Sequence, residues 1–272
     1  MIDILLATYN GEKYIKALLH SIEEQTYKNI NLIIRDDSSK DNTLNIIKEF
    51  QTKSSLNIQI IQDNKGNLGS TRCFEELIKH STSDYFMFCD QDDVWLPQKV
   101  NQTYLKIKEL ESTNPQKPVL VFTDLYVVNE NLQIIADSFF NLQKLYPDVC
   151  HNPWKCMALS VAPGCTMLLN KECKKFILPI PSFLVHDHWI ITNIAYYGKC
   201  DYIPWGTILY RQHSNNCIGA HPTRKYDAFL KLKAYSTLIP HYIKEFKSYH
   251  FKVKYLYVIF YKIAFFIKRF FL

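Results

Sequence analysis

The chain contains the stretch Tyr85-Phe86-Met87-Phe88-Cys89-Asp90-Gln91-Asp92-Asp93-Val94-Trp95, an apolar run that ends in three carboxylates. A continuous apolar run rich in aromatic residues predicts a buried strand. Carboxylates are unfavourable to bury without a counter-ion, so we expect this strand to carry Asp90, Asp92 and Asp93 to an edge of a sheet. Ligands of open α/β sheets bind outside the carboxyl ends of the strands, which favours a site for a phosphate-bearing ligand and a hard cation. The alternative is an acidic turn that caps the helix expected from Pro97.

Strand and helix patterns alternate on both sides of this stretch. Before it we expect strands over residues 2–8, 30–34 and 56–61, helices over residues 12–25 and 41–53, and an amphipathic helix that contains Phe74, Leu77 and Ile78. After it we expect a helix over residues 97–111, strands over residues 119–128, 165–169 and 203–210, a less regular region over residues 129–160, and a helix that ends near residue 197. The alternation predicts an α/β fold with a doubly wound, mostly parallel sheet.

The composition is that of a globular protein. Of 272 residues, 47% are hydrophobic and 21% are charged, which excludes a disordered chain. The eight cysteines form no C-x-x-C pair, which favours reduced thiols in the cytosol. The chain enters its first strand without a basic segment or a cleavage site, and no uncharged apolar run reaches the roughly 18 residues of a membrane span, so neither a secretory signal nor a spanning helix is predicted.

Polar residues follow two further strands of the expected sheet. The second strand runs into Arg35-Asp36-Asp37-Ser38, where Asp37 could accept hydrogen bonds from a base or a ribose. The loop over residues 63–72 is rich in Gly and Asn and precedes a helix, so its backbone N–H groups and Arg72 could bind phosphate. It lacks both G-x-G-x-x-G and G-K-[ST], so neither a dinucleotide site nor a P-loop is predicted, and a plain turn is the alternative.

Two late segments carry candidate catalytic or metal-binding groups. Asp187 lies between His186 and His188 at an expected helix start, in a partly aromatic setting where desolvation raises the pKa of a carboxylate and suits it to general base catalysis. The alternative is that Asp187 only caps the helix. His213 ends a later strand and is a candidate metal ligand or phosphate contact, or else a solvated loop histidine.

The C-terminal tail carries the basic charge of the chain. Residues 223–272 hold eleven Lys and Arg side chains against two acidic ones, within a net charge of +6 for the whole chain. From Tyr249 to Leu272 the basic residues alternate with aromatic and aliphatic ones, which predicts a helix on a membrane surface. The alternative is a helix that packs on the domain with a charged outer face. No nucleic-acid-reading motif accompanies the charge, so nucleic-acid binding is not predicted.

Five segments, taken in order, resemble inverting family 2 glycosyltransferases of the glycosyltransferase-A fold. They are Ala7 to Gly11, Asp36-Asp37-Ser38, Asn64 to Arg72, Asp90 to Asp93 and His186 to Trp189, and the resemblance covers residues 1–218. Within that family the chain is similar to bacterial rhamnosyltransferases of polysaccharide assembly, through Phe122-Thr123-Asp124 with Val128, Pro163 to Met167 and Tyr210 to His213. The Q-x-x-R-W motif and long membrane helices of processive synthases are missing, which favours addition of a single sugar.

The resemblance and the residue patterns together assign candidate roles. Nucleotide-sugar contacts are expected from Thr8, Tyr9, Asp37, Asn64, Arg72, Asp90 and Gln91. A Mn or Mg cation is expected at Asp92 and His213, and Asp187 is the expected catalytic base. Acceptor contacts are expected from Asp93, His186, Trp189 and Arg211.

The expected organisation is a catalytic domain over residues 1–222, with a nucleotide-binding half (1–113) and an acceptor half (114–222), followed by a membrane-associated helical tail (223–272). The expected function is transfer of one sugar, L-rhamnose from dTDP-rhamnose, to a lipid-linked glycan acceptor at the cytoplasmic face of a bacterial membrane during surface or capsule polysaccharide synthesis. Homodimers are compatible with the sequence. Alternatives are a UDP-hexose or UDP-N-acetylhexosamine donor, a nucleotidyltransferase, and a non-catalytic membrane-peripheral scaffold.

Overall fold

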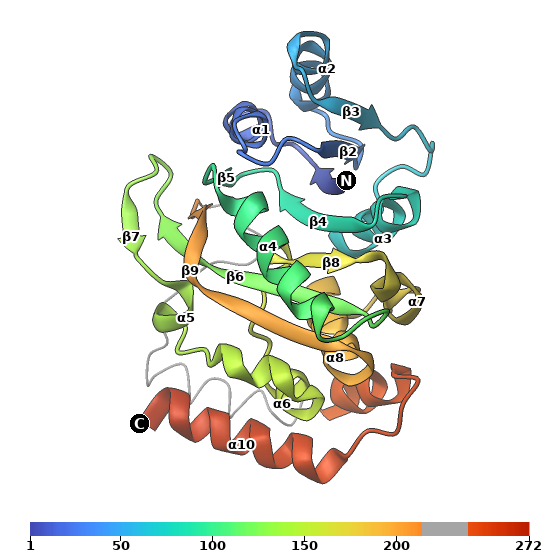
Figure 1. Ribbon diagram of the computed structural model, residues 1–272, viewed down its shortest axis with the longest axis vertical. Coiled ribbons are helices and arrows are strands. Elements are labelled where there is room, and N and C mark those ends of the chain that lie inside the picture. Colours follow the sequence, from blue (N-terminus) through green and yellow to red (C-terminus); the bar gives the residue numbers. More distant parts are fainter. Residues whose placement is uncertain (214–238, 272) are drawn as a thin grey trace.

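The computed structural model describes residues 1–213 and 239–271, which form an α/β fold with helices on both faces of one sheet (Figure 1). The strands are β1 (Ile2–Thr8), β2 (Ile30–Asp36), β3 (Asn57–Ile60), β4 (Tyr85–Asp90), β5 (Val94–Trp95), β6 (Val119–Val128), β7 (Ile134–Ala136), β8 (Leu168–Asn170) and β9 (Lys199–Arg211). Their order in the sheet is β3-β2-β1-β4-β8-β6-β9-β5, and β7 pairs with β6. The predicted doubly wound α/β fold is confirmed.

The helices alternate with these strands along the chain. They are α1 (Ile15–Glu23), α2 (Thr43–Lys53), α3 (Ser70–His80), α4 (Lys99–Ser112), α5 (Phe139–Leu142), α6 (Pro153–Ala158), α7 (Lys174–Ile177), α8 (His186–Tyr197) and α10 (Tyr255–Phe271). Short 3-10 helices cover Pro147–His151, Gly164–Thr166 and Lys171–Cys173, and residues 239–248 are also helical.

The long strand pairs of the sheet are parallel and the short ones are antiparallel. The strand β1 lies between β2 and β4 and is parallel to both, and β6 is parallel to β9. The short strand β8 joins these two groups because it pairs antiparallel with both β4 and β6. In this register Thr8 is level with Asp36 and Ala7 is level with Asp90, so β1, β2 and β4 end at one edge of the sheet.

The strand β4 contributes side chains to both hydrophobic layers, which lie on opposite faces of the sheet. Its side chains point alternately to the two faces, so Phe86 and Phe88 join the layer that contains α3, α6 and α8. Met87 and Cys89 join the layer that contains α1, α2 and α4. All four are fully buried, which explains the continuous apolar run in the sequence. Burying a Phe side chain stabilises a fold by about 1.5–3 kcal/mol.

Several predicted boundaries differ from the observed ones. The first helix begins at Ile15, later than expected, because the N–H groups of Tyr14 and Ile15 both bind the carbonyl of Gly11 in a turn. The strand expected over residues 165–169 is a 3-10 turn followed by β8, and β9 begins at Lys199 because its first residues pair with β6. The region expected to be irregular contains β7, α5 and α6.

The described part of the tail packs on the domain, and α10 lies beside α6 (Figure 1). The ring of Tyr249 stacks on Trp189 with 4.8 Å between centroids, and Phe251 stacks on Tyr196 at 3.8 Å. Within residues 1–213 and 239–271, none of the helices has the length and apolar character needed to cross a membrane. The predicted domain boundary at residue 222 lies outside the described residues, and the division into two halves stays a prediction.

Candidate functional site

The turns that follow β1 and β4 are tied together at the edge of the sheet. The amide of Gln91 accepts a hydrogen bond from the backbone N–H of Tyr9 at 2.8 Å and donates one to its carbonyl at 2.9 Å. A Cβ atom at Gly11 would lie only 2.3 Å from Oε1 of Gln91, so this contact requires glycine. Thr8 is buried and donates to Asp36 at 2.8 Å, whereas Tyr9 is 46% exposed. Gln91 thus fixes the backbone of Tyr9, whose side chain is exposed, against the turn after β4.

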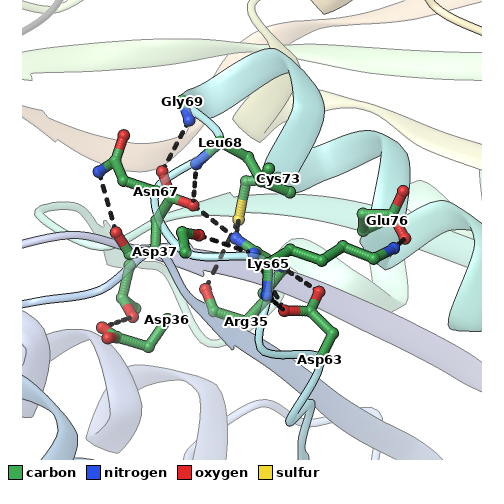
Figure 2. Close-up of polar contacts among 12 residues, drawn as sticks. Arg35, Asp36, Asp37, Asp63, Lys65, Asn67, Leu68, Gly69, Cys73 and Glu76 are labelled. Atoms are coloured by element: carbon green, nitrogen blue, oxygen red, sulfur yellow. Dashed lines mark hydrogen bonds and ion pairs between the residues drawn. The ribbon is translucent and has the colours of Figure 1, made fainter.

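Arg35 organises the loop between β3 and α3, as Figure 2 shows. Its side chain is 1% exposed and pairs with Asp37 at 2.5 Å and with Asp63 at 2.8 Å. Asp37 also accepts hydrogen bonds from the backbone N–H groups of Leu68 at 2.7 Å and Gly69 at 2.8 Å. The carboxylate of Asp37 is therefore engaged within the protein and anchors the loop to the end of β2.

The contacts of Arg35 and Asp37 affect the N–H groups that were predicted to bind phosphate in the loop over residues 63–72. The N–H groups of residues 68 and 69 are bound to Asp37, so they are not directed at a ligand. Asn64 is exposed, and Arg72 pairs with Glu75 on its own helix at 2.5 Å. Nucleotide contacts from Asp37, Asn64 and Arg72 stay predictions. The sequence analysis overlooked Arg35, although a charged residue at the end of an apolar strand beside two carboxylates was a usable signal.

The turn after β4 brings together residues that are far apart in the sequence. Oδ2 of Asp92 lies 2.9 Å from Nε2 of His213, and the imidazole stacks on the ring of Tyr14 with 4.7 Å between centroids. Asp90 is half-buried, and burial raises its pKa to about 7, helped by the negative charges of Asp92 and Asp187. Asp187 therefore contributes to the electrostatic environment of the strand-end carboxylate Asp90.

Asp187 lies in the first turn of α8 and is half-buried. The residue that caps this helix is Val185, so the alternative that Asp187 is the cap is wrong. Oδ1 of Asp187 accepts a hydrogen bond from the backbone N–H of His188 at 2.5 Å. A half-buried carboxylate on an element separate from the strand ends is suited to general base catalysis, and this role of Asp187 stays a prediction.

The four predicted acceptor contacts are poorly placed to touch an acceptor. Asp93 is 0% exposed, and Oδ1 accepts a hydrogen bond from the backbone of Arg211, whereas no partner for Oδ2 occurs within the described ranges. Burial raises its pKa well above the ordinary value. Trp189 is 2% exposed and donates to the carbonyl of Ile177. Arg211 is buried and binds the backbone carbonyls of Asp92 and Glu130.

His186 is buried as well, packed 4.5 Å from the ring of Phe74 between centroids. A Cβ atom at Gly164 would lie 2.6 Å from Nε2 of His186, so this glycine makes room for the imidazole. A direct acceptor contact does not fit side chains with so little exposed surface. Acceptor contacts from Asp93, His186, Trp189 and Arg211 stay predictions, and the burial of these side chains speaks against them.

The residues Asp92 and His213 fit a divalent cation. Carboxylate oxygen and imidazole nitrogen are both ligands of Mn, and Mg prefers carboxylate oxygen. A second group, Asp90, Asp93 and Cys165, also has its ligand atoms within 4.8 Å of one another. Burial raises the pKa of the Cys165 thiol well above its usual value, so a thiolate is disfavoured there and this second group does not suit a hard cation.

Comparison with protein families assigns the chain to a family. Residues 3–161, more than half of the chain, match the family model described as "Glycosyl transferase family 2". The chain belongs to glycosyltransferase family 2. This membership argues against the nucleotidyltransferase alternative and confirms the resemblance noted in the sequence.

The chain is similar in sequence to two named glycosyltransferases. The dTDP-rhamnosyl transferase RfbG of Shigella flexneri is 33% identical over 79% of this chain and 74% of its own length. The glucosyltransferase WfaP of Escherichia coli, named for UDP-Glc and an α-D-GlcNAc-diphosphoundecaprenol acceptor, is 37% identical over 37% of this chain and 39% of its own length.

A solved structure shares the fold over nearly the whole chain. The mannosyltransferase PcManGT of Pyrobaculum calidifontis, solved in complex with GDP-Man and Mn²⁺, superposes with a TM-score of 0.63 at 14% identity. The match covers 97% of this chain and 69% of that chain. At this identity the likeness shows the fold alone, and it agrees with the layers and the sheet described above.

Proposed function

We propose that this glycosyltransferase moves a single sugar, L-rhamnose from a dTDP donor, onto a lipid-linked glycan with inversion at the anomeric carbon. The similarity to RfbG over 79% of the chain supports the donor, and the acceptor named for WfaP supports the lipid-linked glycan. The chemistry is supported by the 2.9 Å contact between Asp92 and His213 and by the position of the half-buried Asp187 in the first turn of α8, from which its charge raises the pKa of Asp90.

Each residue then has a separate task. A divalent cation held by Asp92 and His213 would neutralise the charge that develops on the diphosphate leaving group. Asp187 accepts the proton of the acceptor hydroxyl as the hydroxyl oxygen attacks the anomeric carbon, on the side opposite the diphosphate leaving group. The two hydrogen bonds between the Gln91 amide and the backbone of Tyr9 hold the exposed ring of Tyr9 against the donor. Arg35 fixes the loop that follows β3. The division of tasks predicts that donor binding and proton transfer can be impaired separately.

A panel of nucleotide sugars tests the function and the cation together. We expect transfer from dTDP-rhamnose with Mn or Mg, loss of transfer in excess chelator, and recovery when Mn is restored. Asp92→Asn is expected to raise the Mn concentration required for half-maximal activity. Product formation is measured with a lipid-linked glycan as acceptor. Full activity in chelator would contradict the metal assignment, and transfer only from UDP-hexose or UDP-N-acetylhexosamine would establish the alternative donor.

We further propose that α10 rests on the inner face of the cytoplasmic membrane. One side of this helix packs on the domain, where Val258 and Phe270 are buried. The other side exposes a stripe of large apolar side chains at helical spacing, with Leu256 81% exposed. The stripe consists of Leu256, Ile259, Phe260, Ile263, Ile267 and Phe271. Exposed Lys252 and Lys254 precede the helix and are suited to anionic lipid headgroups.

Vesicle binding tests this placement. We expect the protein to cosediment with phosphatidylglycerol-containing vesicles, more weakly with phosphatidylcholine alone, and to lose binding when Phe260→Glu and Ile263→Glu are combined. Leu105→Glu is the matched control, because Leu105 is a 60% exposed apolar residue on α4. Equal vesicle binding by the double variant and the control would refute the assignment.

A further inference from the structure

The C-terminal segment reaches back to the first turn of α8. Glu245 belongs to the helical residues 239–248, and Oε1 of Glu245 lies 2.9 Å from Nε2 of His188. Glu245 is only 2% exposed. Burial acts to raise its pKa, but the contact with His188 and the charge of Lys262 lower it below the ordinary value. A charged side chain of the tail is therefore buried against the element that carries Asp187.

The tail holds two consecutive residues of α8. The Nε2 atom of the His188 ring contacts Oε1 of Glu245. The backbone N–H of His188 donates a hydrogen bond to Oδ1 of Asp187 at 2.5 Å. The ring of Trp189 stacks on Tyr249, whose hydroxyl also reaches Oε1 of Glu245 at 3.4 Å. Glu245 contacts His188, and His188 in turn binds Asp187. A change at Glu245 is therefore expected to affect the carboxylate of Asp187 through His188.

Packing alone does not account for a carboxylate at this position. A buried charge is unfavourable unless it is paired, and apolar side chains of similar size usually stabilise such a contact at least as well. The stacking of Tyr249 on Trp189 and of Phe251 on Tyr196 already supplies the apolar contact between the tail and α8. The contact between the buried Glu245 carboxylate and the imidazole of His188 therefore suits a role that depends on orientation, and His188 is next to the expected base.

We propose that Glu245 is a positioning residue of the catalytic site, which holds His188 and thereby fixes Asp187 for proton transfer. The tail then contributes Glu245 to the positioning of the active site and also contacts the membrane. The inference rests on the proposed function, since it assigns Asp187 as the base. A displacement of about 1 Å at a reacting group can lower a rate about 100-fold.

Kinetics of the full chain test the proposal. We expect Glu245→Ala to lower kcat about 10- to 100-fold with the donor KM changed less than about twofold, in line with the loss of orientation. Glu245→Gln keeps an oxygen that accepts from the imidazole, so it should recover most of this loss. In an Asp187→Asn background, Glu245→Ala should have no further effect, whereas a general loss of structure would lower the residual rate again.

A matched variant separates positioning from stability. Glu111 on α4 accepts hydrogen bonds from Tyr85 at 2.6 Å and Asn170 at 3.1 Å, on a different element from Asp187. Glu111→Ala is expected to lower Tm without lowering kcat. A normal kcat in Glu245→Ala, or an equal kcat loss in both variants, would overturn the proposal.

Hydrogen exchange keeps the test independent of the proposed function. If the unmodified protein transfers no sugar from any donor, the proposed function fails, but the tail contact can still be measured. Exchange of the backbone amides of residues 187–191 is expected to accelerate in Glu245→Ala and to stay unchanged in Glu111→Ala. Unchanged exchange in both variants would overturn the positioning role.

Discussion

Replacement of Asp187 by asparagine is expected to lower kcat for sugar transfer by about 10²- to 10⁴-fold, the usual contribution of a general base. Asparagine has almost the same size, and its amide oxygen can still accept the hydrogen bond that His188 donates to Asp187. The change therefore removes the proton acceptor and keeps the local structure. Donor binding should be almost unaffected, because the expected donor contacts lie on elements other than α8.

Kinetics and calorimetry together check this result. The transfer rate is measured with saturating donor and acceptor, and the affinity for the donor is measured by titration calorimetry without acceptor. Asp84→Asn is the matched control, since Asp84 is an exposed carboxylate that pairs with Lys171 and precedes β4, at the opposite end of that strand from Asp90. An unchanged kcat in Asp187→Asn would show that another group accepts the proton.

The sequence predicted the fold because local patterns determine it. The apolar run of β4 and the alternation of strands and helices follow from burial and periodicity alone, and parallel strands that end at one edge bring their polar ends together. For the same reason the pairing of Asp92 with His213 could be expected across 121 residues. The sequence did not predict β5, β7, α5 or α6, and the boundaries of other elements were displaced where turns and strand pairing decide their ends.

The sequence could not show which carboxylate of a cluster turns inward. Asp90, Asp92 and Asp93 are chemically alike, yet Asp93 is fully buried while Asp92 reaches His213. The direction of each side chain depends on the local turn and on the backbone of Arg211, which lies far along the chain. The same holds for Glu245 and His188, which no periodic pattern connects over 57 residues.

Arg35→Met is expected to destabilise the fold by about 3–5 kcal/mol, the usual effect of removing one partner of a buried ion pair. Methionine fills a similar volume, so the loss comes from charge and hydrogen bonding. Two carboxylates, Asp37 and Asp63, would lose their guanidinium partner (Figure 2). Urea unfolding measures the change, and Lys53→Met is the control, because Lys53 and Glu49 form an exposed pair for which no measurable change is expected.

The pH dependence of stability gives this prediction a second, independent readout. The hydrogen bond from Arg35 is the main reason that the pKa of Asp63 lies below its usual value of 3.8. A carboxylate with a lowered pKa in the folded state stabilises the fold above the unfolded pKa, and this contribution is lost as the pH falls through the folded value. Arg35→Met should therefore flatten the part of the acid unfolding curve that Asp63 contributes.

A second substitution can separate the buried charge from the hydrogen bonds. In Arg35→Met with Asp37→Asn, the uncompensated charge at position 37 is gone. Leu68 and Gly69 donate to different oxygens of Asp37, so the single amide oxygen of asparagine can keep one of these two hydrogen bonds. We expect this double variant to be more stable than Arg35→Met alone, because the unpaired buried charge is the largest part of the cost. If it is less stable instead, the hydrogen bonds of Asp37 to the loop outweigh its charge, and the loop over residues 63–69 is held chiefly by that carboxylate.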